Sequence, residues 1–237
     1  MTGLIDGDIV AYRAAASCEK RDKEGNLISL EPEEIALLRA DNTMMDILHS
    51  EEDHITFLTG KNNFRYTINP EYKANRRGKP KPEYLQAIRD YLVQEYKTVI
   101  TDGIEADDAL GIHQTENSII YSIDKDLLMI PGHHFNFVTK EYLEVSELDG
   151  IRAFYRQMLI GDTSDNIFGV KGIGKVRAAK LINHLEDEDE MYNTVFDLYM
   201  HPTCPLIDDE ERFNMNANCL WIQRKEGELF TDRYVHK

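Results

Sequence analysis

Short apolar runs separate longer stretches in which apolar and polar residues mix. Runs rich in β-branched residues predict four strands: a first strand ending at Asp6, then residues 54–58, 98–101 and 118–123. Between them the spacing predicts helices over residues 82–96 and 105–114, the first opened by Pro82, which suits an initial helical turn. Strands that alternate with helices predict an α/β fold with a mostly parallel central sheet flanked by helices.

The pattern changes near residue 150. After Ser146 the spacing is helical throughout, and the sequence holds no internal repeat and no low-complexity linker. We therefore predict an α/β core over residues 1–150, from which a loop or arch over about residues 61–89 emerges. A helical region with an acidic tail is predicted over residues 151–237, where the lone Trp221 suggests a small helical cap.

Composition narrows the class of protein. Apolar residues make up 42% of the chain, enough for a proper core, yet no run of about 18 apolar residues predicts a membrane span. The amino-terminal segment lacks the pattern of a secretion signal. Three scattered cysteines, Cys18, Cys204 and Cys219, without a CxxC spacing, argue against disulfides and zinc. These features favour a cytoplasmic protein.

Charge is distributed unevenly. The net charge is −16, yet residues 60–89 carry eight basic and two acidic side chains, and residues 171–180 carry four bases and no acid. The acidic run at residues 186–190 is typical of a solvated face. Each basic segment lies beside a second, independent sequence motif. We therefore predict that both segments contact phosphates of a nucleic acid.

Carboxylates recur where the predicted strands end. Parallel strands place their carboxyl ends along one crevice, so these side chains are expected to converge. They are Asp6, Glu105, Asp107, Asp108, Asp124, Asp126, Asp162 and Asp165. Any one of them alone could be a helix cap or a turn residue, and Asp8 is ambiguous. The joint occurrence predicts a metal centre.

Such a cluster requires cations. Like charges a few ångströms apart repel by several kcal/mol at an intermediate dielectric, as an order of magnitude. Hard divalent ions with oxygen ligands remove that cost. We therefore predict two Mg²⁺ ions, for which Mn²⁺ can substitute, in the arrangement that hydrolyses phosphodiesters.

The glycine-rich segment at residues 169–175 predicts a phosphate-binding turn. Gly172 and Gly174 allow the backbone to turn tightly and to present N–H groups at a helix start, beside Lys171 and Lys175. This segment resembles a helix-hairpin-helix, which holds a duplex backbone without reading bases. The spacing differs from that of a dinucleotide-binding loop.

A second basic site lies within the predicted arch. On a helix, Lys73 would neighbour Arg76 and Arg77 and could clamp one phosphate with them. Tyr72 or Phe64 could stack on a base. From composition alone, a solvated basic loop fits equally well.

Together these motifs resemble the 5′-nuclease family of flap endonucleases, polymerase I 5′ nuclease domains and phage 5′–3′ exonucleases. Five segments keep the family order: Leu4–Gly7, Phe64-Arg65 with Pro70–Arg76, Gly103–Asp108, Ser122–Asp126, and Gly161–Asn166 running into Gly169–Lys175. The short length and arch sequence look most like compact phage exonucleases. The resemblance implies a PIN-like sheet with a helical arch and a carboxyl-terminal helix-hairpin-helix.

The resemblance also implies roles. Asp6, Glu105, Asp107 and Asp108 would hold the first metal, and Asp124, Asp126, Asp162 and Asp165 the second. Lys73 and Arg76 would stabilise the scissile phosphate. Further DNA contacts are expected from Arg65, Tyr72, Arg77, Lys79, Lys81 and the hairpin, which could bind K⁺.

The resemblance implies a monomer that acts on DNA at 5′ ends, flaps or nicks, in DNA replication. RNA–DNA hybrids are a further expected substrate, and the products would carry 5′-phosphates. If the chain is phage-encoded, its compartment is the cytoplasm of the infected bacterium.

The chain departs from the family at one position. Many members have an aspartate at the end of the second predicted strand, where this chain has Thr59. Two alternatives therefore stay open: a DNA-end-binding protein with a weakened metal site, and a phosphatase of the haloacid-dehalogenase type. Asp6-Gly7-Asp8 mimics the nucleophile motif of such phosphatases, although it leaves the arch and the hairpin unexplained.

Overall fold

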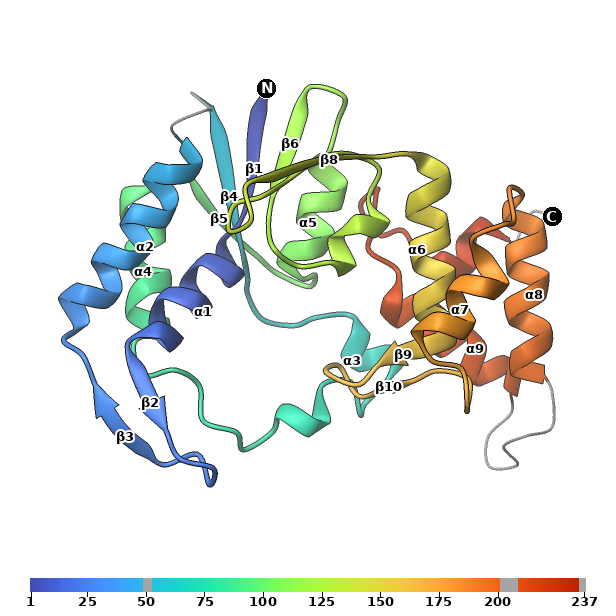
Figure 1. Ribbon diagram of the computed structural model, residues 1–237, viewed down its shortest axis with the longest axis horizontal. Helices are drawn as coiled ribbons and strands as arrows, with labels where there is room; N and C mark the ends of the chain where they lie inside the picture. Colours follow the sequence, from blue (N-terminus) through green and yellow to red (C-terminus); the bar gives the residue numbers. More distant parts are fainter. Residues whose placement is uncertain (49–52, 201–208, 235–237) are drawn as a thin grey trace. The chain divides into compact units, whose positions relative to one another are not determined.

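A computed structural model describes residues 1–48, 53–200 and 209–234 (Figure 1). The chain forms two compact units. The first comprises residues 1–62, 78–127 and 132–144, and the second comprises residues 63–77, 128–131 and 145–237. The predicted arch is thus divided between the units: residues 61–62 and 78–89 belong to the first, and residues 63–77 belong to the second. The domain boundary near residue 150 stays a prediction.

A six-stranded sheet forms the centre of the first unit, in the order β5-β4-β1-β6-β7-β8. Every pair from β5 to β7 is parallel. The strands are β1 (Thr2–Asp6), β4 (His54–Thr59), β5 (Thr98–Thr101), β6 (Ser118–Tyr121), β7 (Gly132–Asn136) and β8 (Glu141–Val145). The predicted α/β fold with a mostly parallel sheet is confirmed.

Helices flank this sheet. They are α1 (Gly7–Ser17), α2 (Glu33–Leu48), α4 (Leu85–Glu95) and α5 (Ala106–His113). α1 packs against α2, α4 and β4, while α5 packs against β1, β4 and β5. Gly7 allows the close approach of α1, because a Cβ there would lie 2.7 Å from the carbonyl oxygen of Phe57.

The first unit has one apolar core, built from β-branched strand residues and small helix residues such as Ala11 and Ala40. An antiparallel hairpin of β2 (Glu19–Arg21) and β3 (Leu27–Leu30) follows α1. The hairpin contacts the segment before α4, since the side chain of Glu19 accepts a 3.0 Å hydrogen bond from the backbone N–H of Glu83. The short helix η2 (Asp126–Met129) follows β6.

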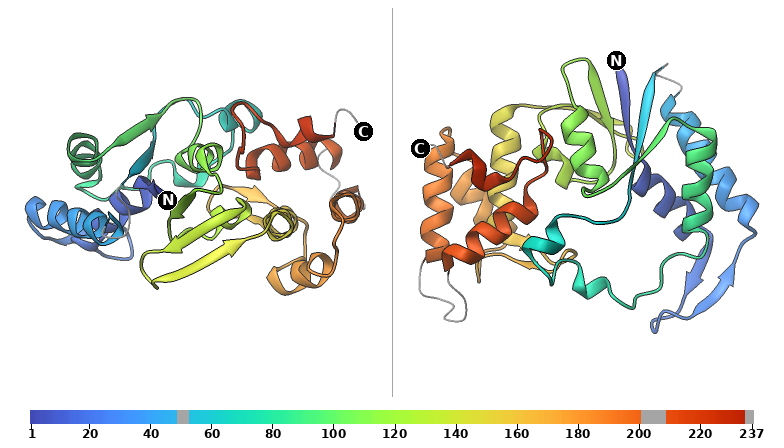
Figure 2. Two further views of the ribbon diagram at one scale, coloured as in Figure 1. Left: turned by 90° about the horizontal axis from the view of Figure 1, so that it is seen from above. Right: turned by 180° about the vertical axis from the view of Figure 1, so that it is seen from behind.

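The second unit is mainly helical (Figure 2). Its elements are α3 (Arg65–Ile68), η1 (Ala74–Arg76), α6 (Glu147–Ile160), β9 (Gly161–Asp162), β10 (Ile167–Phe168), α7 (Lys175–Ile182), α8 (Glu188–Met200), α9 (Asp209–Leu220) and η3 (Phe230–Arg233). α6 packs against α7, α8 and α9. Trp221 is 1% exposed and lies within an aromatic core with Phe154 and Phe230.

None of the helices in the described ranges is both long and apolar enough to cross a membrane. Cys18 and Cys219 are buried and form no disulfide among the described residues, and Cys204 lies outside those residues.

Candidate active site

The carboxyl ends of β4, β1 and β6 lie side by side, and Asp6 stands at the centre of this edge. Asp6 is 1% exposed. One carboxylate oxygen accepts a 3.1 Å hydrogen bond from the N–H of Ile9, which caps α1. The other accepts a 2.7 Å bond from Ser122, whose hydroxyl accepts a 3.0 Å bond from the N–H of Asp124. The loop after β6 is thereby fixed to the end of β1.

Burial raises the pKa of Asp6 from its ordinary value of 3.8 to about 7. Hydrogen bonds from Ser122 and Ile9 lower it, while the negative charges of Asp8 and Asp124 raise it further. The edge of the sheet therefore concentrates more negative charge than the protein alone stabilises. A group in this state favours either a proton or a cation.

The raised pKa has a consequence for stability. The metal-free fold favours protonated Asp6, so this residue's contribution is fully present below pH 3.8 and is lost as pH rises through about 7. In EDTA we expect Asp6→Asn to unfold like wild type at pH 4 and to be more stable at pH 8, by about 2–4 kcal/mol. Urea unfolding at both values measures this, and an equal difference at the two pH values would contradict it.

Asp8 is held by a network that the sequence did not indicate. Its carboxylate accepts a 2.9 Å bond from the N–H of Thr59 and an ion-paired bond from Arg89. Arg89 also donates to the carbonyl of Thr59 at 2.5 Å. Arg89, counted above among basic residues expected at phosphate, is therefore engaged with the end of β4. Its partner lies 81 positions away, a pairing that no local pattern indicates.

Thr59, at the position of the family's aspartate, joins two elements. Its hydroxyl accepts a 2.9 Å hydrogen bond from the N–H of Ala106, at the start of α5. Glu105 and Asp108 cap the same helix reciprocally, with the N–H of Glu105 donating to Asp108 at 3.0 Å. Both carboxylates are buried, whereas Asp107 is half-buried.

The predicted convergence of carboxylates is not seen as a metal-sized cluster. Across the described ranges, no group of three or more His, Cys, Asp or Glu side chains is placed to hold a metal ion. Internal donors engage these carboxylates instead: Asp124 accepts a 2.9 Å bond from the N–H of Asp126, and Glu105 and Asp108 cap α5. The ligand roles of the eight acids stay predictions.

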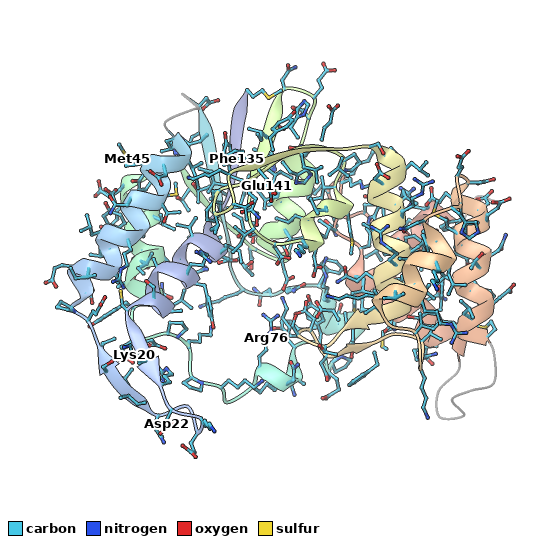
Figure 3. The ribbon with its side chains drawn as sticks, in the orientation of Figure 1. Lys20, Asp22, Met45, Arg76, Phe135 and Glu141 are labelled. Atoms are coloured by element: carbon cyan, nitrogen blue, oxygen red, sulfur yellow. The ribbon has the colours of Figure 1, made fainter. Side chains whose placement is uncertain are left out.

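In the second unit, Asp162 and Asp165 belong to the loop between β9 and β10. Asp162 accepts a 2.7 Å bond from the N–H of Ser164. Asp165 contacts Arg76 at 2.6 Å and Lys73 at 3.6 Å, so the two cations predicted to act on the scissile phosphate gather at this carboxylate. Of these side chains, Arg76 is labelled in Figure 3.

The prediction that Lys73, Arg76 and Arg77 lie together on a helix is wrong. Lys73 has a left-handed φ of 55° and precedes η1, a helix of only three residues. Arg77 is exposed and donates a 2.6 Å bond to the carbonyl of Pro70. Lys79 and Lys81 are exposed in the first unit, as a phosphate contact requires.

Two residues predicted to contact DNA are buried. Arg65 is 2% exposed, and its guanidinium donates 2.8 Å bonds to the carbonyls of Cys219 and Trp221. Tyr72 is 1% exposed, and its hydroxyl donates to Asp165 at 2.7 Å. In this structure Arg65 ties α3 to the segment after α9, and the ring of Tyr72 is not available to stack on a base. Both are therefore reassigned to structural support.

The glycine-rich turn precedes α7 as predicted, although the two-residue strand β10 and not a helix leads into it. Gly172 has a φ of 79°, and nothing lies within 4 Å of the position of a Cβ at Gly172 or Gly174. Lys171 and Lys175 are exposed. Phe168, which sequence reasoning missed, is 68% exposed beside this turn, while Asn216 fixes its carbonyl at 2.9 Å. The turn therefore presents open backbone, two cations and one aromatic ring.

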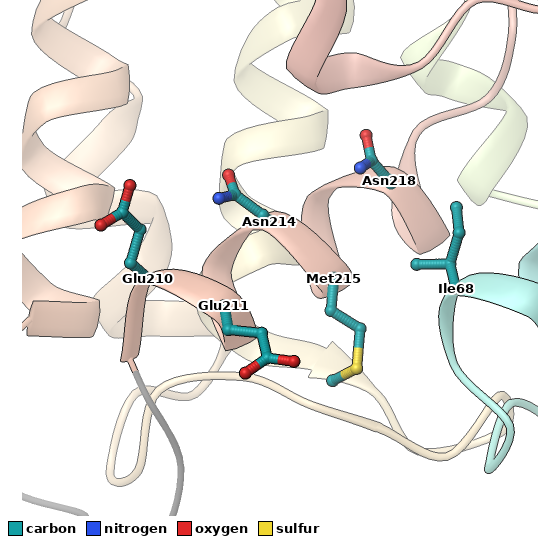
Figure 4. A pocket seen from close by; sticks show the side chains of 6 residues that line it. All are labelled: Ile68, Glu210, Glu211, Asn214, Met215 and Asn218. Carbon is teal, nitrogen blue, oxygen red and sulfur yellow. The ribbon is translucent and has the colours of Figure 1, made fainter.

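A groove of about 440 Å³ lies elsewhere in the second unit, between α3 and α9 (Figure 4). It is lined by Ile68, Glu210, Glu211, Asn214, Met215 and Asn218. None of the predicted catalytic, metal or DNA-binding residues lines it, so the groove is not the candidate site.

Comparison with known proteins finds a matching family model and similar sequences. The family model described as "5'-3' exonuclease, N-terminal resolvase-like domain" matches residues 1–158. A 5'-3' exonuclease of Buchnera aphidicola subsp. Schizaphis graminum is 29% identical over 215 residues, which cover 81% of this chain and 73% of that protein. A 5'-3' exonuclease of Mycoplasma pneumoniae is 30% identical over 220 residues, covering 80% and 74%.

The fold has a counterpart among solved structures. The bacteriophage T5 D15 flap endonuclease, in a pseudo-enzyme-product complex with DNA and metal ions, superposes with a TM-score of 0.61. The alignment covers 92% of this chain and 84% of that chain at 20% identity. At this identity the likeness concerns the fold.

Proposed function

The chain belongs to the 5′–3′ exonuclease family, and from this premise we propose that it is a structure-dependent 5′ nuclease that hydrolyses DNA phosphodiesters near 5′ ends with two bound divalent cations. The observation that carries the proposal is Asp6, a buried carboxylate with a pKa of about 7 beside Asp8 and Asp124. A strongly perturbed acid at the carboxyl edge of a parallel sheet is a functional feature.

The donor set fits a hard cation. Every predicted ligand is a carboxylate, which suits Mg²⁺ or Mn²⁺. Asp6, Glu105, Asp107 and Asp108 would hold one ion, and Asp124 and Asp126 the other. Asp162 keeps its predicted role as a metal ligand, and Asp165 is considered below. Asp124, Glu105 and Asp108 each accept a bond from a backbone N–H, and a carboxylate has further lone pairs with which to bind an ion. Bound divalent ions lower the pKa of water and offset charge on a phosphodiester.

The remaining roles fall to side chains of the second unit. Lys73 and Arg76 stabilise negative charge on the scissile phosphate. The turn at residues 169–175 binds duplex backbone through open N–H groups, Lys171 and Lys175, with K⁺ as a further ligand. RNA in RNA–DNA hybrids is a further substrate, and the products carry 5′-phosphates. The T5 D15 flap endonuclease, whose fold is similar, was solved in a complex with DNA and metal ions, which supports DNA and metal ions as ligands of this chain.

The test compares 5′-flap, nicked and blunt duplexes, labelled at the 5′ end, with product sizing in Mg²⁺. We expect release of short 5′-phosphorylated products, fastest from the preferred structure. Binding without cleavage would favour the weakened, DNA-end-binding alternative, for which Thr59 is the motivating feature. Release of phosphate from p-nitrophenyl phosphate, with a covalent adduct on Asp6, would favour the phosphatase.

The hairpin gives a prediction of its own. We expect the double change Lys171→Ala and Lys175→Ala to weaken duplex binding about tenfold at moderate salt and to lower the salt slope by about 2. The rate at saturating DNA should stay near wild type. Binding titrations at several salt concentrations measure this.

The matched control removes two exposed lysines that already pair with aspartates, Lys97 with Asp53 and Lys140 with Asp46. It should leave the salt slope unchanged. An equal loss of affinity in the two double variants would show that overall charge, and not the turn, governs binding.

A further inference from the structure

The loop at residues 162–166 is fastened to the segment at residues 71–76 along its whole length, within the second unit. Asn75 donates to the carbonyl of Thr163 at 2.6 Å, and Arg76 to that of Ser164 at 2.9 Å. In the opposite direction, Asn166 donates to the carbonyl of Glu71 at 2.9 Å. The N–H of Lys73 donates to the carbonyl of Asp165 at 2.9 Å. Two segments about 90 positions apart therefore behave as one piece.

Asp165 lies at the middle of this junction. Its side chain is 15% exposed and accepts hydrogen bonds from the hydroxyl of Tyr72 at 2.7 Å and from the guanidinium of Arg76 at 2.6 Å. The ammonium of Lys73 lies 3.6 Å away. A partly buried carboxylate that already faces two cations is a poor ligand for a third positive ion, because binding it would require giving up charge-assisted hydrogen bonds. Asp162, three positions earlier, forms no ion pair with any described residue.

Lys73 also has a backbone that requires support. Its φ of 55° lies in the left-handed region, which is uncommon and unfavourable for a residue with a side chain. The N–H bond to Asp165 holds this conformation, and the ammonium lies 4.9 Å from the ring centre of Tyr72. Backbone strain at a residue with a chemical role is typical of preorganised sites.

We infer that Asp165 is a positioning residue, which holds Lys73 and Arg76 in place for the phosphate, and not a metal ligand. The inference rests on the proposed function for the roles of Lys73 and Arg76. The junction itself does not depend on that function. Tyr72 takes part as the neutral anchor of the same carboxylate.

The test compares Asp165→Asn with Asp162→Asn. For Asp165→Asn we expect kcat to fall about 10- to 100-fold while the Mg²⁺ concentration for half-maximal rate stays within about twofold of wild type. Asp162→Asn should instead raise that Mg²⁺ concentration. Because Asp165 acts through Lys73 and Arg76, adding Asp165→Asn to the double variant Lys73→Ala/Arg76→Ala should not slow the reaction further.

Limited proteolysis by trypsin gives a second measurement, which does not depend on catalysis. Loosening the junction should speed tryptic cleavage after Lys73, Arg76 and Arg77 in Asp165→Asn, and to a smaller degree in Tyr72→Phe, with Asp162→Asn near wild type. If Asp165→Asn instead weakens Mn²⁺ binding by calorimetry and leaves the tryptic rate unchanged, the inference is overturned. A wild-type protein that cuts no DNA would defeat the proposed function, while the tryptic comparison would still decide the junction.

Discussion

Replacing Asp124 by asparagine is expected to abolish cleavage, in that the cleavage rate falls about a thousandfold or more. DNA binding should stay unchanged. Asp124 follows β6, and its N–H bonds the Ser122 hydroxyl that in turn bonds Asp6. Its negative charge is felt at Asp6, whose pKa it raises. Loss of this charge at the centre of the carboxylate edge should weaken cation binding without disturbing the basic surfaces that hold the duplex.

The measurement pairs single-turnover cleavage with a binding titration in Ca²⁺ or EDTA. Asp102→Asn is the matched control, because Asp102 lies in an exposed turn. Among the described residues, the side chain that bonds its carboxylate is that of Asn62, at 3.1 Å. That control should cut at the wild-type rate. Turnover close to wild type in Asp124→Asn would remove Asp124 from the cation site.

Replacing Lys73 by alanine is expected to lower kcat by about a hundredfold with little change in KM. The side chain of Lys73 is 19% exposed, and its ammonium lies 3.6 Å from Asp165 and 4.9 Å from the ring centre of Tyr72. A cation fixed in this way contributes more to a transition state, in which phosphate charge increases, than to ground-state binding. Steady-state kinetics on one flap substrate measure the two constants separately.

Lys79→Ala provides the comparison for Lys73. Lys79 is exposed, with no ion pair in the described part of the chain, and should affect duplex affinity and not kcat. We therefore expect Lys79→Ala to raise KM alone. If Lys73→Ala behaves in the same way, with its change confined to KM, Lys73 belongs to the binding surface and not to the reacting centre.

Local pattern predicted the parts of this fold that depend on neighbours in the chain. β1 ends at Asp6 as expected, and the apolar run before Ser122 forms β6 at the centre of the parallel sheet. The helix expected from Pro82 begins at Leu85. α1 was missed, because its start at Gly7 reads as an acidic turn until Gly7 is seen packed against Phe57.

The sequence predicted which residues belong to the site, but not which of them bond to one another. Residue type and strand ends identified Asp6, Asp124 and Lys73, yet nothing local indicates that Arg89 binds Asp8 or that Tyr72 binds Asp165 across 93 positions. Burial likewise depends on the complete fold, which is why Arg65 could be taken for a DNA contact although it supports the segment around Trp221.

The most direct test of the central claim measures cleavage of a 5′-labelled flap duplex as Mg²⁺ is added to protein freed of metal with EDTA. We predict no product in EDTA and a rise with Mg²⁺ that saturates, with Mn²⁺ also supporting the reaction. Digestion that continues undiminished in excess EDTA would contradict the account, because the carboxylate edge around Asp6 would then have no cation to hold.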